Sequence, residues 1–500
     1  MNEPGTDHPQ GATSTPSLGD KATRGIAWMV SQAAVNKVVT TIGQMILGMI
    51  LVPEDYGLVA LTYMFGTASV LIQQGGLHEV LIKRKRHFHR WANSAFWMSM
   101  CLGVVGCAIM VAFAPVAGTL CDDDRLTRLM LIMALFFPID AFCTVPLALA
   151  HGRMQFRFIA AVQLGQSVVA VSLSILLAML DWGPFAAIAP RPVVPLIGAI
   201  AYWIKAPVPL RRGLQFRRWR YLVGDSALVF AANCCDMAIL YLGTLALSVA
   251  YNKSVVGDYF FMFNLSLQTM VLISLRLRGV LFPALSTLAD DPQRQSRAFL
   301  RALRLISFVV LPACLLQAAL SDAGVRAIYA GRWSHAIPML QVLSIGMAIR
   351  SVGWPAVSML QAQGRFGTRL VLVIISLVSQ AILICLGLWW FGPIGVALAT
   401  TVNWIVIDPV SVYVAVRHTG YGWRDVARAL GPPAALGLLV VGPAVLVDMA
   451  IPDMAGRDWW RVALITSVAA ALYVPMFRTL APEAWQEMRQ RLVGMLGRSR

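Results

Sequence analysis

Long apolar runs separated by short polar segments repeat along the chain from residue 24 to residue 480. A run of about 20 apolar residues can cross the hydrocarbon core of a bilayer as a helix, which satisfies its own backbone groups there. The pattern therefore predicts an all-α polytopic membrane protein with about fourteen transmembrane helices. The predicted spans are 24–50, 57–82, 91–117, 126–150, 158–180, 184–203, 225–250, 257–285, 303–328, 336–362, 369–391, 394–416, 426–449 and 459–480.

Three short sequence features occur twice, in the same order, at separations of roughly 200 residues, which indicates an internal repeat. They are PEDYG at Pro53–Gly57 with VGDYF at Val256–Phe260, Gly152-Arg153 with Gly364-Arg365, and WGPF from Trp182 with FGPI from Phe391. Because six is even, two repeats of six spans would cross the membrane in the same direction. We therefore predict two six-helix lobes around a central cavity and two extra C-terminal helices.

This repeat divides the chain into six predicted regions. They are a disordered cytoplasmic tail (1–20), an N-lobe (21–203), a cytoplasmic interfacial linker (204–224), a C-lobe (225–416), an extra helix pair (417–480) and a cytoplasmic amphipathic tail (481–500). The linker and the last tail combine arginine with aromatic or apolar residues, which is typical of segments that lie on an anionic membrane surface. Residues 1–20 lack an apolar core, so no cleaved signal peptide is expected.

Composition supports the membrane assignment. The chain is 58% hydrophobic and 13% charged with a mean hydropathy of +0.69, whereas soluble domains are about 25% charged. The net charge of +17 does not indicate nucleic acid, because the basic residues cluster at alternate ends of the spans. This bias places both termini in the cytoplasm. The eight cysteines form no C-x-x-C pair and are interpreted as small core residues.

Charged residues inside predicted spans are candidates for function, since a cation at mid-membrane costs about 3 kcal/mol. Lys37 shares a helical face with Thr41 and Gln44 in the first span. Polar candidates for the same cavity lie in the eighth and tenth spans: Asn264, Gln268, Arg278, Arg350 and Trp354. The first hypothesis is a cationic cavity in which Lys37, Arg278 and Arg350 bind an anionic headgroup.

The alternative hypothesis is that these cations pair inside the protein with Asp140, Asp236 or Asp408 and only join helices. The three aspartates are then counter-charges, or else sites for a coupling ion. In particular, Lys37 on the first helix of one lobe could pair with Asp236 on the first helix of the other. The sequence leaves both hypotheses open.

The sixth span is interrupted by Pro190-Arg191-Pro192, which predicts a broken helix that serves either as a gate or as a simple kink. Evidence for catalysis is weak. Asp122-Asp123-Asp124 falls in a predicted outer loop, and Asp290-Asp291 precedes Pro292 as expected for a helix cap. We find no nucleotide-binding G-x-x-x-x-G-K-[ST] motif, and expect no catalytic residue, metal site or cofactor.

Several segments together resemble a known family. They are LVPEDYGLVAL, HGRMQFRF, GDYFF, RGVLFPALSTLADD, IYAGRWSHAIPMLQVLS and LQAQGRF, within residues 20–420. This combination is similar to that of the polysaccharide-biosynthesis flippases, or Wzx-type exporters, of the multidrug/oligosaccharidyl-lipid/polysaccharide exporter superfamily. The resemblance implies two six-helix lobes, alternating access, and movement of undecaprenyl-diphosphate-linked oligosaccharide across a bacterial inner membrane. It also implies coupling to H+ or Na+, membrane lipids as partners, and association with polymerase and export machinery.

Under this resemblance Lys37, Arg350 and Arg278 would meet the diphosphate, while Gln44, Asn264, Gln268 and Trp354 would contact sugar or lipid. Two other functions stay open from the residues. A drug or cation antiporter of the same superfamily would favour a cavity rich in carboxylates. A membrane polymerase or ligase would need a sizeable outer loop with acid, base or oxyanion groups, and the predicted outer loops are short.

Overall fold

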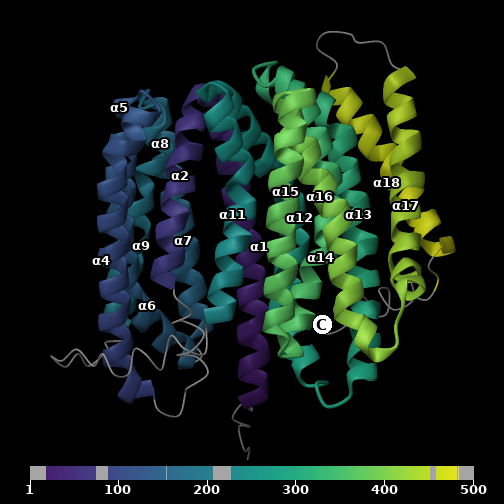
Figure 1. The fold of residues 1–500 in the computed structure, drawn as a ribbon, viewed down its shortest axis with the longest axis horizontal. Coiled ribbons are helices and arrows are strands. Elements are labelled where there is room, and N and C mark those ends of the chain that lie inside the picture. Colours follow the sequence, from purple (N-terminus) through teal and green to yellow (C-terminus); the bar gives the residue numbers. More distant parts are fainter. Residues whose placement is uncertain are drawn as a thin grey trace, which may run out of the picture.

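The computed structural model describes residues 18–74, 88–153, 155–205, 227–450, 458–480 and 482. In this part of the chain all regular structure is helical, and the helices stand side by side as one bundle (Figure 1). The predicted tail 1–20 is almost wholly outside the described residues. So are the predicted interfacial linker, apart from residues 204 and 205, and the amphipathic tail, apart from residue 482.

The helices of the N-lobe come first along the chain. They are α1 (Leu18–Ile50), α2 (Pro53–Gln74), α4 (Phe88–Leu120), α5 (Asp124–Ala134), α6 (Phe136–Gly152), α7 (Phe156–Met179), α8 (Phe185–Ile188) and α9 (Pro190–Lys205). The C-lobe follows as α11 (Ala227–Ala250), α12 (Lys253–Ser286), α13 (Pro292–Tyr329), α14 (Ile337–Ala362), α15 (Phe366–Phe391) and α16 (Pro393–Val416). The extra pair is α17 (Trp423–Ala450) and α18 (Asp458–Leu480), and two 3-10 turns lie at Ser334–Ala336 and Arg417–Thr419.

The helices confirm the predicted spans. Eleven helical stretches in the described residues are long and apolar enough to cross a membrane, and α1, α2 and α12 occupy the three remaining predicted spans. Two spans are each divided between two helices, α5 with α6 and α8 with α9. The second division falls at Ala189, so Pro190 begins α9, a position where proline loses no hydrogen bond. The bounds of the predicted regions stay a prediction.

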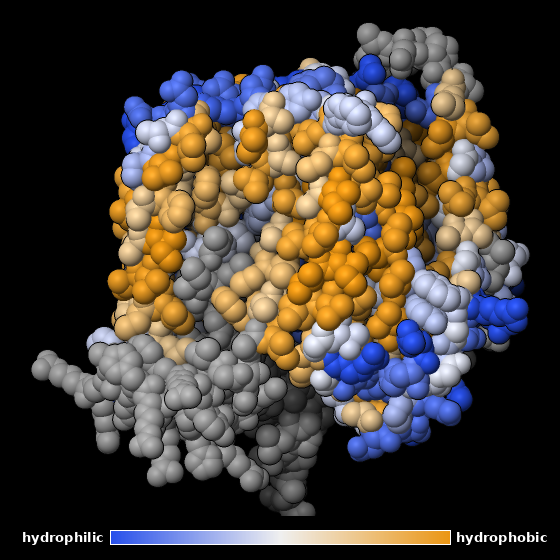
Figure 2. All heavy atoms as spheres, viewed as in Figure 1, coloured by the Kyte–Doolittle hydropathy of each residue, from blue (hydrophilic) through white to orange (hydrophobic). Residues whose placement is uncertain are grey.

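We call the end of the bundle uppermost in Figure 1, where α1 ends at Ile50 and α2 begins at Pro53, the upper end. Large exposed aromatic residues lie near this end on the α7–α8 turn, the end of α15 and the start of α18. They are Trp182, Trp389, Trp390, Phe391, Trp459 and Trp460. Figure 2 shows a wide apolar band below a polar upper rim. A belt of aromatic residues at the edge of an apolar band is typical of a membrane interface, so this is a multi-pass membrane protein.

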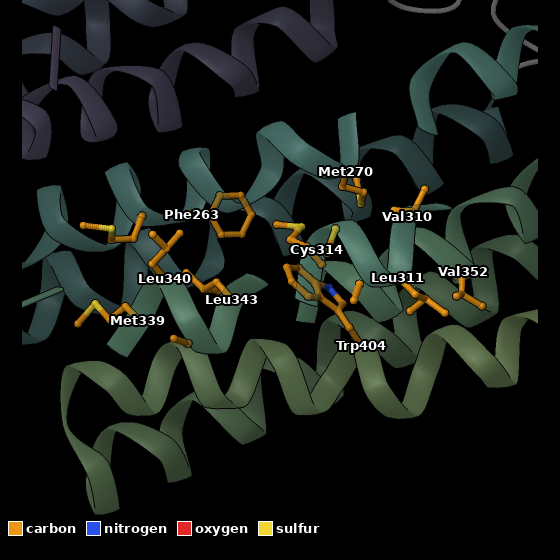
Figure 3. Close-up of a cluster of buried hydrophobic side chains, with 14 of the residues drawn as sticks. Phe263, Met270, Val310, Leu311, Cys314, Met339, Leu340, Leu343, Val352 and Trp404 are labelled. Atoms are coloured by element: carbon orange, nitrogen blue, oxygen red, sulfur yellow. The ribbon is translucent and has the colours of Figure 1, made fainter. Parts of the chain in front are cut away.

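The largest apolar core lies in the C-lobe, between α12, α13, α14 and α16. Phe263, Cys314, Leu343 and Trp404 meet there (Figure 3). The α17–α18 pair packs on α13 through a second cluster. Arg461 at the start of α18 is bonded to Asp448, with an Nε–Oδ1 distance of 2.8 Å. A cap predicted from the sequence is confirmed at the start of α13, where the Asp291 side chain accepts from the backbone N–H of Arg294 at 3.0 Å.

The lobes meet at the upper end through a reciprocal contact between α2 and α12. A Cβ on Gly57 would overlap the carbonyl of Lys253, and a Cβ on Gly257 would overlap the carbonyl of Pro53. Gly57 is the fifth residue of α2, and Gly257 is the fifth residue of α12. Their lack of a side chain lets the two backbones cross, and each of the segments PEDYG and VGDYF supplies one of the two glycines.

Side chains of the C-lobe also cap the end of α1. Arg332 donates from Nη1 to the carbonyl oxygens of Met49 and Ile50 at 2.6 and 2.9 Å. The indole N–H of Trp333 donates to the carbonyl of Gly48 at 3.0 Å. These are carbonyls of the last helical turn, which have no partner within their own helix. The contacts therefore hold the upper ends of the two lobes together.

An ion-pair cluster joins the lobes at the same end. Lys253 of α12 lies 2.9 Å from Asp123 of the N-lobe, measured from Nζ to Oδ2. Arg125 bridges Asp123 and Glu54, with its Nη2 atom 2.7 Å from the Glu54 Oε1 atom. Partial burial raises the pKa of Asp123, but hydrogen bonds from Arg125 and Lys253 outweigh it and lower the pKa to about 2. Asp123 thus caps α5 and joins the lobes.

Candidate functional site

A cavity of about 450 Å³ lies between the lobes, below the upper-end contacts. Residues of α1, α2, α7, α9, α11 and α12 line it, with Phe136 of α6, Ala187 of α8 and Tyr329 of α13. Tyr56 and Phe261 lie in its lining and pack against each other and against the buried Trp333. These rings close the cavity toward the upper end. Among the described lining residues there is no aspartate or glutamate.

Amide side chains form one wall, where α1 meets α12. Gln268 of α12 accepts a hydrogen bond from the Lys37 ammonium and donates through its Nε2 group to the Gln44 side chain. Gln44, Asn264 and Gln268 all line the cavity. Asn264 donates to the carbonyl of Phe260 on its own helix at 2.8 Å. The polar faces predicted for the first and eighth spans thus face each other across this wall.

Arg191 and Tyr63 form the opposite polar feature. Arg191, the second residue of α9, donates from Nε to the Tyr63 hydroxyl at 2.8 Å, and its guanidinium lies 4.6 Å from the Tyr63 ring centroid. Tyr241 of α11 lies close to both residues. Arg191 is surrounded by protein, yet its side chain is exposed, because it lines the cavity. Its described partner is a phenol and not a carboxylate.

Three other predicted intramembrane charges, Arg350, Asp408 and Asp236, pair inside the C-lobe. Arg350 of α14 lies 3.0 Å from the buried Asp408 of α16. Asp236 of α11 accepts from the buried Arg369 of α15 at 2.8 Å, and Asn233 accepts from the same nitrogen at 2.9 Å. Pairing between helices, the alternative hypothesis for such charges, is therefore what the structure has for Asp408 and Asp236.

The structure corrects one predicted pair and places the remaining candidates. Asp236 binds Arg369 and Lys37 binds Gln268, so the pairing of Lys37 with Asp236, one of the two roles that the sequence left open for Lys37, is wrong. Arg350 and Trp354 face α16 and the core and do not line the cavity described above. Asp140 is half-buried on α6. The structure describes the backbone of Arg278 on α12 but not its side chain.

Of the predicted broken helix, Pro190 and Arg191 line the cavity and Pro192 does not. The gating role stays a prediction. Sequence reasoning missed Tyr63, Tyr241 and Gln166 as lining residues, because nothing in a single span distinguishes such a side chain from one that faces lipid. It noticed Arg191 only as part of a proline-rich break. The available signal for Arg191 was the presence of a charged residue inside a short predicted span.

No group of three or more His, Cys, Asp or Glu residues in the described part of the chain is arranged to hold a metal ion. Asp123, within the acidic run of residues 122–124, forms ion pairs with Arg125 and Lys253. The cavity lining offers amides, hydroxyls, aromatic faces and the Arg191 guanidinium, and the Lys37 ammonium lies beside it, bonded to the lining residue Gln268. Such a set can bind an anionic, hydroxyl-rich molecule by hydrogen bonds and by ring contacts.

Two helical lobes that enclose a cavity with polar side chains inside a membrane-spanning bundle are the architecture of a transporter. Residues 46–338 match the family described as "Polysaccharide biosynthesis protein". Because this match covers more than half of the chain, the protein belongs to that family. The predicted membership in the Wzx-type exporters of the superfamily is thereby confirmed.

Two curated relatives and one solved structure are similar over most of the chain. The lipopolysaccharide biosynthesis protein WzxC of Escherichia coli (strain K12) is 22% identical, over 87% of this chain and 88% of the relative. The succinoglycan biosynthesis transport protein ExoT of Rhizobium meliloti (strain 1021) is 24% identical, over 85% and 84%. The lipid II flippase MurJ in an inward closed conformation has the same fold, with a TM-score of 0.69 at 15% identity, over 90% of this chain and 99% of MurJ.

Proposed function

We propose that this protein moves undecaprenyl-diphosphate-linked oligosaccharide units across the bacterial inner membrane, from the inner to the outer leaflet, for the synthesis of surface or exported polysaccharide. The similarity to WzxC and ExoT, whose names describe polysaccharide biosynthesis and transport, supports this class of substrate. So does the shared fold with a lipid II flippase. Transport is by alternating access, and coupling to H+ or Na+ is part of the proposal. Polymerase and export proteins are proposed partners.

The observation that carries the proposal is the charge of the cavity. Its described lining contains Arg191 and no carboxylate, and the Lys37 ammonium contacts Gln268 at its wall. A cation inside a membrane protein is costly without a counter-charge. An anionic ligand such as a diphosphate supplies that counter-charge, and the amides and tyrosines match the hydroxyl groups of sugars.

The upper end is proposed to face the outside of the cell. The predicted positive-inside orientation puts the α1–α2 turn on that side. The upper end of the cavity is closed by the crossing of α2 and α12 at Gly57 and Gly257 and by the hydrogen bonds from Arg332 to the end of α1. The conformation described is then closed to the outside. The substrate would enter the cavity from the lower, cytoplasmic end, and release requires the upper contacts to separate.

The proposal is tested in cells that lack the protein. We expect lipid-linked oligosaccharide to accumulate in the inner leaflet, where an impermeant reagent on the outer side does not reach it, and surface polysaccharide to disappear. Expression of the wild-type chain should reverse both effects. Normal surface polysaccharide and no accumulated intermediate in the deletion strain would refute the proposal.

Two other functions are less well supported. An antiporter for cationic drugs would use carboxylates in its cavity, and the described lining has none. A polymerase or ligase would need acid, base or oxyanion groups placed around a reacting bond. Two of the acidic residues described at the upper end, Glu54 and Asp123, are engaged in ion pairs between elements. Efflux of a cationic dye or polymer formation by the purified protein would favour these functions instead.

A further inference from the structure

Two cations, Arg191 in the cavity lining and Lys37 beside it, differ from three arginines that pair inside the bundle. Arg350, Arg369 and Arg461 each lie within 3.0 Å of a carboxylate oxygen. Lys37 and Arg191, by contrast, have an amide and a phenol as their described partners. Paired cations join helices, whereas an unpaired cation at a cavity wall is available to a ligand. The cavity therefore presents two separate positions for negatively charged groups.

The two positions lie at different depths. Tyr63, which holds Arg191, stacks on Phe260 with a centroid distance of 6.2 Å. Gln268, which holds Lys37, is eight residues further along the same helix α12. At a rise of 1.5 Å per residue, Phe260 and Gln268 are about 12 Å apart along α12, so the Lys37–Gln268 contact lies further from the upper end than the Arg191–Tyr63 contact. The two cations are therefore presented at different depths along the bundle.

The depth order assigns the two positions. In the proposed function the substrate enters from the lower end with its saccharide foremost. The diphosphate, which joins the saccharide to the lipid, then stays nearer to the lower end than the saccharide does. Lys37 is then nearer to the diphosphate. Arg191 lies at the level of Phe260, just below the Tyr56 and Phe261 rings that close the cavity toward the upper end. A group that reaches Arg191 belongs to the saccharide part of the substrate.

The chemistry at Arg191 fits a carboxylate. A guanidinium binds a carboxylate through parallel N–H donors, and the Arg191 Nη groups make no hydrogen bond to any described residue. The Tyr63 oxygen accepts from Arg191 Nε, so its own O–H is available to donate to the same ligand. The Tyr63 ring beside the guanidinium also restricts its orientation. These groups together form a binding position for a carboxylate carried on a ring-shaped, hydroxylated molecule.

We infer that the oligosaccharide carried by this protein is itself acidic, and that Arg191 with Tyr63 binds a carboxylate group of the saccharide while Lys37 serves the diphosphate. This inference rests on the proposed function. It adds the chemical class of the glycan, an acidic sugar or a sugar with a carboxyl-bearing substituent, and it adds the end of the cavity at which that group is recognised.

The first experiment uses the lipid-linked intermediates that accumulate in cells lacking the protein. Mild acid releases the saccharide, whose charge is measured by anion exchange and whose mass is measured before and after carbodiimide-mediated carboxyl reduction. We expect at least one carboxyl group on each repeat unit. A saccharide without a carboxyl group would overturn the inference and leave the proposed function intact. If no lipid-linked intermediate accumulated, the proposed function would fail first, so the two failures are distinguishable.

The second experiment locates the recognition. The released saccharide and its carboxyl-reduced form are titrated into the purified full-length protein in lipid nanodiscs. We expect the acidic form to bind about tenfold more tightly, since a charge-assisted hydrogen bond is lost with the carboxylate. Arg191→Gln should abolish this preference, whereas Lys37→Gln should keep it and weaken binding of undecaprenyl diphosphate. Unchanged preference in Arg191→Gln, with the thermal unfolding of each variant as a folding control, would overturn the assignment.

Discussion

The presence or absence of a carboxylate partner separates two kinds of cation in this molecule. Arg350 and Arg369 hold Asp408 and Asp236, and both pairs join helices of the C-lobe. Lys37 and Arg191 lie at the cavity without such a partner. A cation in a buried pair and an unpaired cation in a cavity should therefore respond differently to the same substitution.

We expect Arg350→Gln to destabilise the protein by about 3 kcal/mol, because it leaves the buried Asp408 carboxylate uncompensated. Lys37→Gln and Arg191→Gln should leave stability nearly unchanged and reduce polysaccharide export about tenfold. Thermal unfolding in detergent and complementation of a deletion strain measure the two effects. Asp408→Asn added to Arg350→Gln should recover part of the lost stability. Equal loss of stability in all three single variants would contradict the distinction.

Asp123 makes a prediction about pH. Its pKa is lowered to about 2 in the folded protein, mainly because Arg125 and Lys253 offset the effect of burial, whereas an unfolded aspartate titrates near 3.9. The carboxylate therefore stabilises the fold fully above about pH 4, and this contribution is lost as the pH falls toward about 2. At pH 7, Asp123→Asn should cost about 1 kcal/mol.

Thermal unfolding of the wild type and of Asp123→Asn from pH 7 to pH 2.5 checks this. The difference between them should shrink as the pH falls. Asp122→Asn is the matched control, since Asp122 forms no ion pair in the described part of the chain. A difference that stayed constant with pH would show that the charge of Asp123 does not contribute.

At the scale of elements, the crossing of α2 and α12 depends on two residues without side chains. A Cβ at Gly57 or Gly257 would overlap a backbone carbonyl of the other lobe, and a backbone carbonyl cannot rotate away as a side chain can. We expect Gly57→Ala and Gly257→Ala to hold the upper ends apart. Distances between spin labels at the upper ends of the two lobes should increase in both variants, and export should fall.

The matched control is Gly442→Ala in α17, where a Cβ would meet no atom within 4 Å. This variant should match the wild type, because alanine favours a helix more than glycine does. If the two crossing variants kept the wild-type label distances, α2 and α12 would have room that the structure does not indicate.

Elements were the level at which sequence prediction worked best. The length of each apolar run can be read directly from the sequence. The fourteen predicted spans all correspond to one helix or to two consecutive helices. The faces of Gln44 and Gln268 were also correct, since helical spacing is a local property. The pairing of Arg350 with Asp408 was among those that the sequence left open. The pairing of Asp236 with Arg369 was not predicted, because it joins residues 133 positions apart. Arg369 lies at the very start of its predicted span and did not attract attention as an intramembrane charge.

For the whole molecule, the proposed alternating-access cycle requires the upper contacts to break each time. Asp123 and Lys253 lie on different lobes and meet there. In a protein whose eight native cysteines are replaced, Asp123→Cys/Lys253→Cys joined by a short reducible cross-linker should stop export. Reduction of the cross-link should restore it, and each single cysteine should be unaffected by the reagent. Export by the cross-linked protein would mean that the upper ends do not separate.

The unpaired cations of the cavity also make the empty protein sensitive to voltage. Moving one elementary charge through a membrane potential of 100 mV is worth about 2.3 kcal/mol. With Lys37 and Arg191 uncompensated, access to the cavity from the negative interior of a cell is favoured over access from outside. The bound anion cancels this preference, so the loaded protein is freer to open outward. In the proposed orientation, the membrane potential itself would return the empty carrier to the closed-outside state described here.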